Sequence, residues 1–422
     1  MPDSTPVSNL SEALKPVSSM LGNEDDQDRE VPEIDLNWPV GKKLARDLGQ
    51  YVCNYGIFTQ GRRIVTVDDS GDVQEMKPDR FGSWCEKWVS TIKWINGGTR
   101  EVTMAETLAK KVLASDQFRA TLKPLNGVNK VRMPVFRKSG KIELLAEGYD
   151  EESGFYTIDG VKYRRDMKRI EAQSIFEKYL KAFPWGDLNE EGVFHNRSAA
   201  VHMAAMIGTF CRTMFPLGTK RPMITYLANQ PGTGKSLLGV MALAPVFGNV
   251  ATATKPRDDE KFSVVLETIA QSFAPYLFID DIGGGIFSNA LNRFLTSSAH
   301  TGRLFHSNSE MFHVPATTQV FTTGNGIELT PDLQRRALIV DLFLAGDVRG
   351  RNFEVRITED SLSSDEVRAE LLAAMWAFVR DWDQVRATNP LESFEAWTEV
   401  VGAIVMRAGF ADPLALPRHP GI

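Results

Sequence analysis

A glycine-rich segment near the middle of the 422-residue chain has the residue types and spacing that bind phosphate groups. It follows an apolar, β-prone run at 223–228 and opens a helical stretch at 237–246. Its residues are, in order, Asn229, Gln230, Pro231, Gly232, Thr233, Gly234, Lys235, Ser236 and Leu237. Glycines let backbone N–H groups turn toward phosphates, and the helix N-terminus adds a positive end. We therefore expect this segment to hold ATP, with Lys235 reaching the β and γ phosphates and Ser236 ligating Mg²⁺.

One position departs from the usual pattern of such segments. Where the pattern G-x-x-x-x-G-K-S has its first glycine, this chain has Asn229. Asparagine adopts a left-handed backbone conformation more readily than most residues, so we expect the turn to survive. The alternative is a chance glycine-rich turn. It is disfavoured because strand, loop and helix follow one another in the order that a phosphate-binding loop requires.

An apolar run at 276–279 ends in two adjacent carboxylates, Asp280 and Asp281. At the end of a buried strand, such a pair can place one acid near a magnesium ion and the next near the attacking water. We assign Asp280 to the metal and Asp281 to orienting or activating water. A plain surface turn is the alternative, and the position of the pair downstream of Lys235 favours the site.

A third apolar run, at 319–325, ends in the polar side chain of Asn325. Together the three segments resemble the superfamily 3 helicases, which are P-loop ATPases of the AAA+ kind. They resemble more closely the ATPase modules of phage and mobile-element replication proteins. The resemblance implies that Asn325 helps to position water against the γ-phosphate. An asparagine in an ordinary turn is the alternative.

Two adjacent arginines, Arg335 and Arg336, precede the apolar run at 337–340. In AAA+ proteins an arginine at this junction reaches into the site of the neighbouring subunit, where it neutralises charge that develops on the γ-phosphate. The resemblance therefore implies a homo-oligomer, a hexameric ring, with Arg336 as the first candidate and Arg335 as the second. A salt-bridged surface pair is the alternative.

The segment 302–314 holds two β-prone runs around a turn at 308–309, which predicts a hairpin. In superfamily 3 helicases an insertion at this place projects into the channel of the ring and grips the strand. The resemblance makes Arg303, His306 and His313 candidates for contacting single-stranded or forked DNA. The lysine-rich tip of those insertions is missing here.

The pattern of the whole chain predicts the elements that must position these residues. Between 217 and 345, apolar β-runs alternate with helical segments, which predicts an α/β fold with a parallel sheet covered by helices. The resemblance makes this region an AAA+ P-loop NTPase core. We expect a disordered acidic tail at 1–35, a small α+β domain at 36–169, a helical lead-in at 170–216 and a helical segment at 346–422.

The net charge of −6 is unevenly distributed along the sequence. Residues 1–35 hold nine acidic and two basic residues, so the remainder is close to neutral and can still present a basic pore. Bases gather between 119 and 141 and again at 164–169. Such runs indicate a solvated face more often than a nucleic-acid-facing surface.

The three cysteines, Cys53, Cys85 and Cys211, are few and far apart, which argues against a disulfide framework or a four-ligand zinc site. The most apolar stretch, at 199–211, is too short to span a bilayer, so we expect a cytoplasmic protein with no membrane partner. The preferred function is that of an ATP-dependent DNA helicase or translocase in the replication of a phage or mobile element. A protein-remodelling or loader ATPase and a non-catalytic nucleotide switch are the alternatives.

Overall fold

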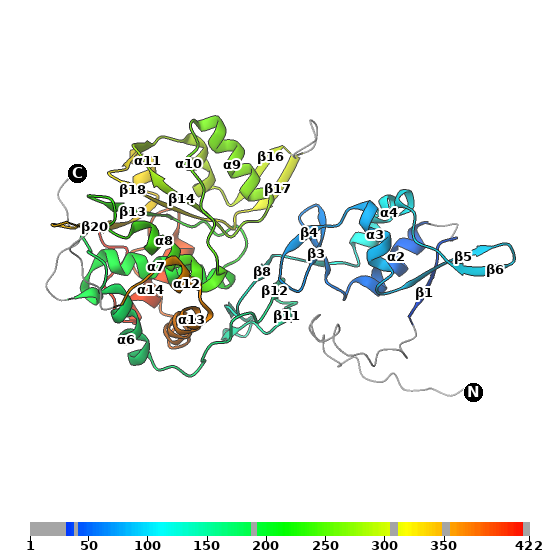
Figure 1. Cartoon of the computed structure of the whole chain (residues 1–422), viewed down its shortest axis with the longest axis horizontal. Coiled ribbons are helices and arrows are strands. Elements are labelled where there is room, and N and C mark those ends of the chain that lie inside the picture. Colours follow the sequence, from blue (N-terminus) through cyan, green and yellow to red (C-terminus); the bar gives the residue numbers. More distant parts are fainter. Residues whose placement is uncertain (1–30, 38–40, 187–191, 304–310, 348–354, 417–422) are drawn as a thin grey trace. The chain divides into compact units, whose positions relative to one another are not determined.

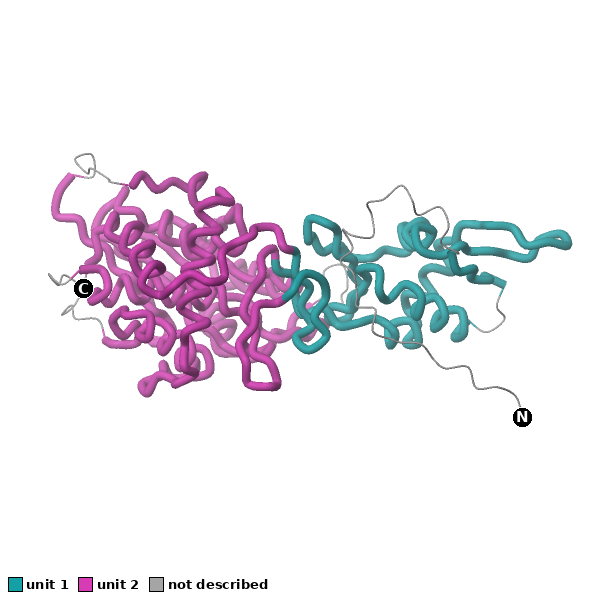
Figure 2. Tube along the Cα trace, turned by 90° about the horizontal axis from the view of Figure 1, so that it is seen from below, with its two compact units in different colours: residues 1–129, 146–158 teal, residues 130–145, 159–422 magenta. Residues whose placement is uncertain are grey.

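A computed structural model of the chain describes residues 31–37, 41–186, 192–303, 311–347 and 355–416. Two compact units divide the sequence, as Figure 2 shows by colour. Unit 1 comprises residues 1–129 and 146–158, and unit 2 comprises residues 130–145 and 159–422. Each unit is described by itself.

The boundary between the units differs from the one expected at residue 169. Residues 130–145 and 159–169 belong to unit 2, because their apolar side chains enter its core. Val131, Met133 and Met167 are all buried there. The Thr213 hydroxyl also donates a hydrogen bond of 2.6 Å to the carbonyl of Pro134.

Unit 1 is a small α+β unit built around one main apolar cluster. Its elements are β1 (Glu33–Asp35), α2 (Gly41–Val52), β2 (Ile57–Gln60), β3 (Arg63–Val67), β4 (Val73–Glu75), α3 (Pro78–Cys85), β5 (Ser90–Ile95), β6 (Gly98–Glu101), α4 (Glu106–Leu113), α5 (Asp116–Arg119), β7 (Lys123–Pro124), β8 (Gly127–Asn129), β11 (Gly148–Tyr149) and β12 (Phe155–Thr157). Apolar residues recur three and four positions apart along α2, and the face they form, with Leu44, Leu48 and Val52, is buried.

The disordered tail was expected to reach residue 35, but residues 33–35 form strand β1. Strand β1 pairs in parallel with β5, and the Ile34 side chain is buried in the core of unit 1. The alternation of Glu33, Ile34 and Asp35 gives the strand one apolar and one polar face, and this is why so short an acidic segment is ordered. Residues 1–30 lie outside the described part of the chain.

Unit 2 holds the expected site. Its elements are β9 (Pro134–Phe136), β10 (Ile142–Leu144), α6 (Arg169–Leu180), η2 (Val193–His195), α7 (Arg197–Phe210), η3 (Arg212–Met214), β13 (Met223–Ala228), α8 (Lys235–Phe247), α9 (Asp259–Gln271), β14 (Tyr276–Ile282), β15 (Gly285–Ile286), α10 (Asn289–Thr296), β16 (Ala299–Arg303), β17 (Met311–Pro315), β18 (Gln319–Asn325), β19 (Glu328–Leu329), α11 (Pro331–Gln334), β20 (Ala337–Leu342), α12 (Glu359–Ser363), α13 (Asp365–Arg380) and α14 (Glu395–Arg407).

A four-stranded sheet in the order β14-β18-β13-β20 forms the centre of unit 2, and all of its pairings are parallel. Helices cover both of its faces (Figure 1). Strand side chains alternate between the two faces: Phe278 enters the cluster with α7 and α8, whereas Leu277 and Ile279 enter the cluster with α9 and α10. A mixed α/β fold with a parallel sheet between helices, as the sequence predicts, is therefore confirmed.

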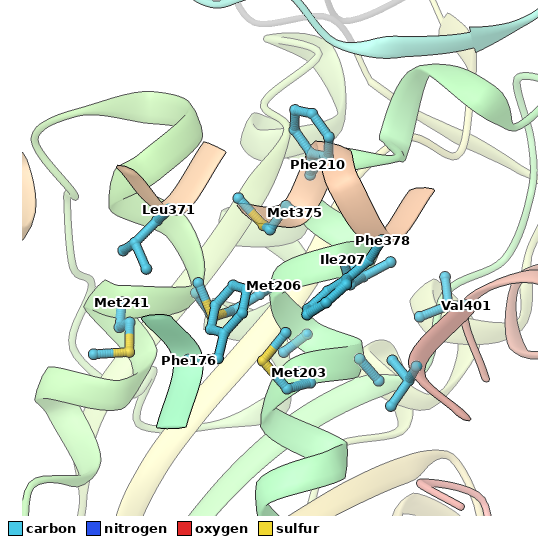
Figure 3. Close-up of a cluster of buried hydrophobic side chains, with 14 of the residues drawn as sticks. Phe176, Met203, Met206, Ile207, Phe210, Met241, Leu371, Met375, Phe378 and Val401 are labelled. Atoms are coloured by element: carbon cyan, nitrogen blue, oxygen red, sulfur yellow. The ribbon is translucent and has the colours of Figure 1, made fainter. Parts of the chain in front are cut away.

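The larger of the two clusters in unit 2 packs helices from distant parts of the sequence together. Figure 3 shows Phe176 of α6, Met206 of α7, Met241 of α8 and Phe378 of α13 in this cluster. Helix α7 is buried on all sides from Ser198 to Phe210, which is typical of a helix in the middle of a core. The C-terminal helices α13 and α14 thus form part of the core of unit 2. None of the helices in the described ranges is both long and apolar enough to cross a membrane.

Candidate functional site

The loop after β13 turns sharply into α8 through two glycines in the left-handed region. Gly232 has φ 79° and Gly234 has φ 105°, and Gly234 directly precedes the first residue of α8. A Cβ at Gly234 would lie 2.9 Å from the Phe183 ring, so this position has no room for a side chain. No side chain caps the start of α8. Its first N–H groups therefore stay available to an anion.

Lys235 and Ser236, the first residues of α8, reach the ends of two neighbouring strands. The Lys235 ammonium donates a hydrogen bond of 2.7 Å to Asn325 Oδ1, and the Ser236 hydroxyl donates one of 2.7 Å to Asp280 Oδ1. Burial lowers the pKa of Lys235, and the charges of Asp281 and Asp280 oppose this shift. The structure thus brings together residues that the sequence places almost a hundred positions apart.

The two carboxylates lie within a bulge of β14. The register with β18 shifts between Ile279 and Ile282, and Asp281 has φ 50°, a conformation that non-glycine residues rarely adopt. Its N–H donates a hydrogen bond of 3.0 Å to the hydroxyl of Thr323. Strained backbone of this kind is retained where surrounding contacts hold it, and it is concentrated at functional sites.

Thr323 and Gly324 of β18 support this bulge, and sequence reasoning missed both. The buried Thr323 hydroxyl accepts from the Asp281 N–H and donates to the Asp280 carboxylate, so one side chain holds both acids. A Cβ at Gly324 would lie 2.3 Å from the carbonyl oxygen of Ile282. Both residues belong to the apolar run that ends at Asn325. Their roles depend on the pairing of β18 with β14, which the spacing of residues in the sequence does not predict.

Lys255 is a further residue of the site without a signal in the sequence. Its ammonium donates hydrogen bonds to the carbonyls of Gly283, at 3.1 Å, and Gly285, at 3.0 Å. The segment before it joins the sheet through a parallel bridge between Ala253 and Ile279. Lys255 therefore ties the glycine-rich segment that follows the acids to the outer edge of β14.

Asn229 does not play the backbone role expected of it. Its φ is not positive, and the left-handed residues of the loop are Gly232 and Gly234 instead. The side-chain amide of Asn229 pairs with the backbone of Leu344: Nδ2 donates to the carbonyl at 2.9 Å, and Oδ1 accepts from the N–H at 3.1 Å. Gln230 Nε2 donates to the carbonyls of Leu344 and Gly346, both at 2.9 Å. The loop is thereby fastened to the segment that follows β20.

The remaining residues of the predicted loop are Pro231, Gly232, Thr233 and Leu237. Pro231 is exposed, Thr233 is buried and Leu237 packs against the larger core cluster. Gly232 is exposed on the loop. Backbone N–H groups of this stretch, rather than its side chains, would contact phosphates.

The structure does not bring Arg335 and Arg336 to this site within one chain. Ala337 pairs with Met223, the first residue of β13, so both arginines lie at the amino edge of the sheet. The loop follows the other end of β13. A strand of six residues at ~3.3 Å per residue separates the loop from the arginines by about 20 Å. Arg336 Nη1 donates to Asn292 Oδ1 at 2.5 Å. Arg335 is exposed and pairs with Asp332.

The expected hairpin is confirmed as the antiparallel pair β16–β17. Arg303 lies opposite Met311, and His313 lies opposite Thr301, so both candidates are on the hairpin, and both are exposed. Phe312 and Val314 alternate with them and enter the core. His306 lies outside the described residues.

Several bases of the basic runs noted in the sequence pair with carboxylates. Lys123 pairs with Glu151 at 3.0 Å, and Arg137 pairs with Glu143 at 3.1 Å. Arg164 contacts both Asp166 and Glu171. The structure therefore favours a solvated face for these paired bases.

No family model and no curated protein matches the sequence. Among solved structures, the A form of the apo NrS-1 C-terminal region has a TM-score of 0.43 and 11% identity, and the match covers 86% of this chain and 74% of that one. The NrS-1 305–718 region gives a TM-score of 0.41 at 12% identity, covering 79% and 69%. A structure described as the active helicase Cch of SCCmec type IV gives 0.34 at 11% identity, covering 82% and 66%. At these low TM-scores the likenesses determine neither the fold nor the activity of this chain.

Proposed function

We propose that unit 2 binds and hydrolyses ATP and uses the reaction to move along or unwind DNA. One observation carries the ATPase proposal. Lys235, Ser236, Asp280, Asp281 and Asn325 come from separate segments and meet at the carboxyl edge of one parallel sheet. Open α/β sheets bind ligands at this edge, where the chain connections diverge to opposite sides.

The donor set fits a magnesium ion held together with phosphates. Ser236 Oγ and Asp280 Oδ1 lie 2.7 Å apart, and hydroxyl and carboxylate oxygens are the ligands that Mg²⁺ prefers. The described residues include no cluster of three or more acidic, histidine or cysteine ligands. That agrees with an ion that takes only one or two protein ligands beside phosphate and water. When bound, Mg²⁺ would neutralise charge that develops on the phosphates.

Each side chain then has one task toward ATP. The loop N–H groups and Lys235 hold the phosphates, and the hydrogen bond that Lys235 donates to Asn325 would pass to a phosphate oxygen. Asp281, held by Thr323, orients the attacking water and accepts its proton, while Asn325 holds that water against the γ-phosphate. Arg336 of the next subunit in a ring completes the site, because its own chain keeps it at the other edge.

The DNA part of the proposal is supported by the hairpin β16–β17, which presents Arg303 and His313 on its exposed face.

A protein-remodelling ATPase is the second candidate. The observation in its favour is the ion pairing of the basic runs, which leaves fewer free cations for a phosphate backbone.

The test is the rate of phosphate release by the purified chain, with and without single-stranded DNA, beside Lys235→Ala. Stimulation by DNA that vanishes in Lys235→Ala supports the DNA motor. Turnover that is indifferent to DNA moves the assignment to protein remodelling. Absence of turnover in the unsubstituted protein overturns the ATPase proposal and leaves a nucleotide switch.

A further inference from the structure

A cavity of about 270 Å³ in unit 2 lies outside the site described above. Its lining side chains are Arg132, Asp159, Lys162, Tyr163 and Arg165, which carry three positive charges against one negative charge. At ~30 Å³ per water, the volume is that of about nine waters. The cavity can therefore hold an anionic group together with part of the molecule that carries it.

Arg132 is positioned by an ion pair that leaves one of its donors unused. Its Nη2 lies 2.8 Å from Asp159 Oδ2, and the two side chains are 21% and 13% exposed. The Nε atom of Arg132 is buried and has no hydrogen-bond partner in the described part of the chain. This atom has almost no accessible surface, so a molecule in the cavity does not reach it. Arg132 therefore contributes to the cavity through the positive charge of its guanidinium.

The other groups of the cavity leave its positive charge in place. Tyr163 donates a hydrogen bond of 2.6 Å from its hydroxyl to the carbonyl of Arg132, and burial raises the pKa of this phenol, so it stays neutral. Lys162 and Arg165 are exposed, and neither forms an ion pair with a described residue. This distinguishes them from Arg137 and Arg164, whose charges are balanced by nearby carboxylates.

We propose that this cavity binds a phosphate group of single-stranded DNA, whose charge is neutralised by Arg132, Lys162 and Arg165. The phosphate is better supplied by a DNA strand than by free phosphate, because the cavity is larger than a single phosphate ion. Contacts to the phosphate backbone position a strand without reading its sequence. The inference rests on the proposed function only in taking DNA as the ligand, and it needs no ATP hydrolysis.

The experiment measures binding of a fluorescent oligothymidine to the full chain by anisotropy, without nucleotide, over a range of salt concentrations. The double variant Lys162→Ala/Arg165→Ala removes two charges at exposed positions, where folding is not at risk. Each lost phosphate contact lowers the slope of log affinity against log salt by ~0.7, so losing the one contact in the cavity should lower the slope by about 0.7. Arg386→Ala and Arg407→Ala, combined, are the matched control, because both arginines are exposed and pair with carboxylates elsewhere in unit 2.

A second variant tests the charge of Arg132. Arg132→Lys keeps a positive charge at the cavity, so the salt slope should fall less than in the double variant. The melting temperature is measured beside it, because lysine does not reproduce the guanidinium that pairs with Asp159. An unchanged salt slope in the double variant overturns the proposal. So does a fall in the control that equals the fall in the double variant. Inorganic phosphate that binds the wild type but not the double variant, without any DNA binding, overturns the assignment to a strand.

The failures of the two proposals can be told apart. If ATP turnover is stimulated by DNA but the double variant binds DNA with the wild-type slope, the cavity assignment fails and the motor stands. If the double variant loses its slope while the unsubstituted protein releases no phosphate from ATP, the cavity assignment stands and the motor fails.

Discussion

The two edges of the parallel sheet in unit 2 differ in how much of the expected chemistry a single chain assembles. At the carboxyl edge, Lys235 contacts Asn325 and Ser236 contacts Asp280, each at 2.7 Å. At the amino edge, Arg336 contacts Asn292 of α10 and is a strand length away from any of these residues. The proposed function therefore assigns ATP binding and water activation to one edge, and it assigns to the other edge a group that would act on a neighbouring copy of the chain.

The largest effect is expected when some subunits carry a substitution at the amino edge and others carry one at the carboxyl edge. Arg336→Ala and Asp281→Asn should each lower the rate of ATP turnover on the order of 10³-fold, because each removes a group that acts on the γ-phosphate or its water. Mixed in equal amounts, the two variants should regain about a quarter of the wild-type rate, since one in four interfaces in a ring then has both groups intact. Phosphate release by each variant and by the mixture is measured.

A mixture as inactive as its components would contradict the division of labour between the edges. It would place Arg336 either in the structure of its own subunit, through Asn292, or outside the reaction. Melting temperatures of the two variants, measured separately, serve as the control for folding.

The next effect concerns the carboxyl edge alone. Thr323→Val removes the hydroxyl that holds Asp280 and the N–H of Asp281, so the rate of turnover should fall by about 10-fold to 100-fold. Thr322→Val is the matched control. It makes the same change at a buried site on the same strand, where the hydroxyl contacts Thr225 at 2.9 Å and neither acid.

Steady-state kinetics and thermal unfolding of both variants separate the outcomes. Both should lose similar stability, because each loses hydrogen bonds of a buried hydroxyl. Equal rates in the two variants would show that Thr323 supports the fold without positioning the acids.

A smaller effect is expected where the loop is fastened to the segment after β20. Asn229→Gly removes the two hydrogen bonds to Leu344 and should lower the free energy of unfolding by about 1 kcal/mol, since exposed hydrogen bonds contribute little. Glycine restores the usual pattern of the loop, so turnover should persist. Urea unfolding and phosphate release are measured side by side. Loss of turnover at unchanged stability would show that the Leu344 contact is needed for the reaction itself.

The smallest effect is expected from Arg335→Ala at the amino edge. This side chain is exposed and pairs only with Asp332, a kind of ion pair that contributes about 0–1 kcal/mol. The rate of turnover should stay within about threefold of the wild type. If Arg335→Ala is instead as inactive as Arg336→Ala, both arginines act on the neighbouring site or their assignments are exchanged.

Local sequence order explains why some of this arrangement could be predicted. The loop, its helix and the acids follow strands whose apolar runs are continuous, so both the parallel sheet and the polar residues at its carboxyl edge could be inferred. The hairpin β16–β17 was similarly visible as two β-prone runs around a turn.

Contacts across strands explain why the rest could not be predicted. Thr323 and Lys255 act through Asp281 and Gly283, which lie on other segments, and no spacing within the sequence records such a pairing. Asn229 was expected to matter through its backbone, yet its side chain makes the contact, with a residue more than a hundred positions away. The division of the chain into two units could not be predicted either, because it depends on which of the two cores buries a given strand.

That division has a consequence for how the protein can be taken apart. The chain passes from one unit to the other at 129–130, 145–146 and 158–159. A fragment that stops at 129 lacks β12, the strand that pairs with β8, and a fragment that starts at 159 lacks Pro134, the acceptor for Thr213. No single cut therefore releases two intact halves. Unit 2 could not be exchanged between genes as one contiguous segment, so recombination would have to carry both units together.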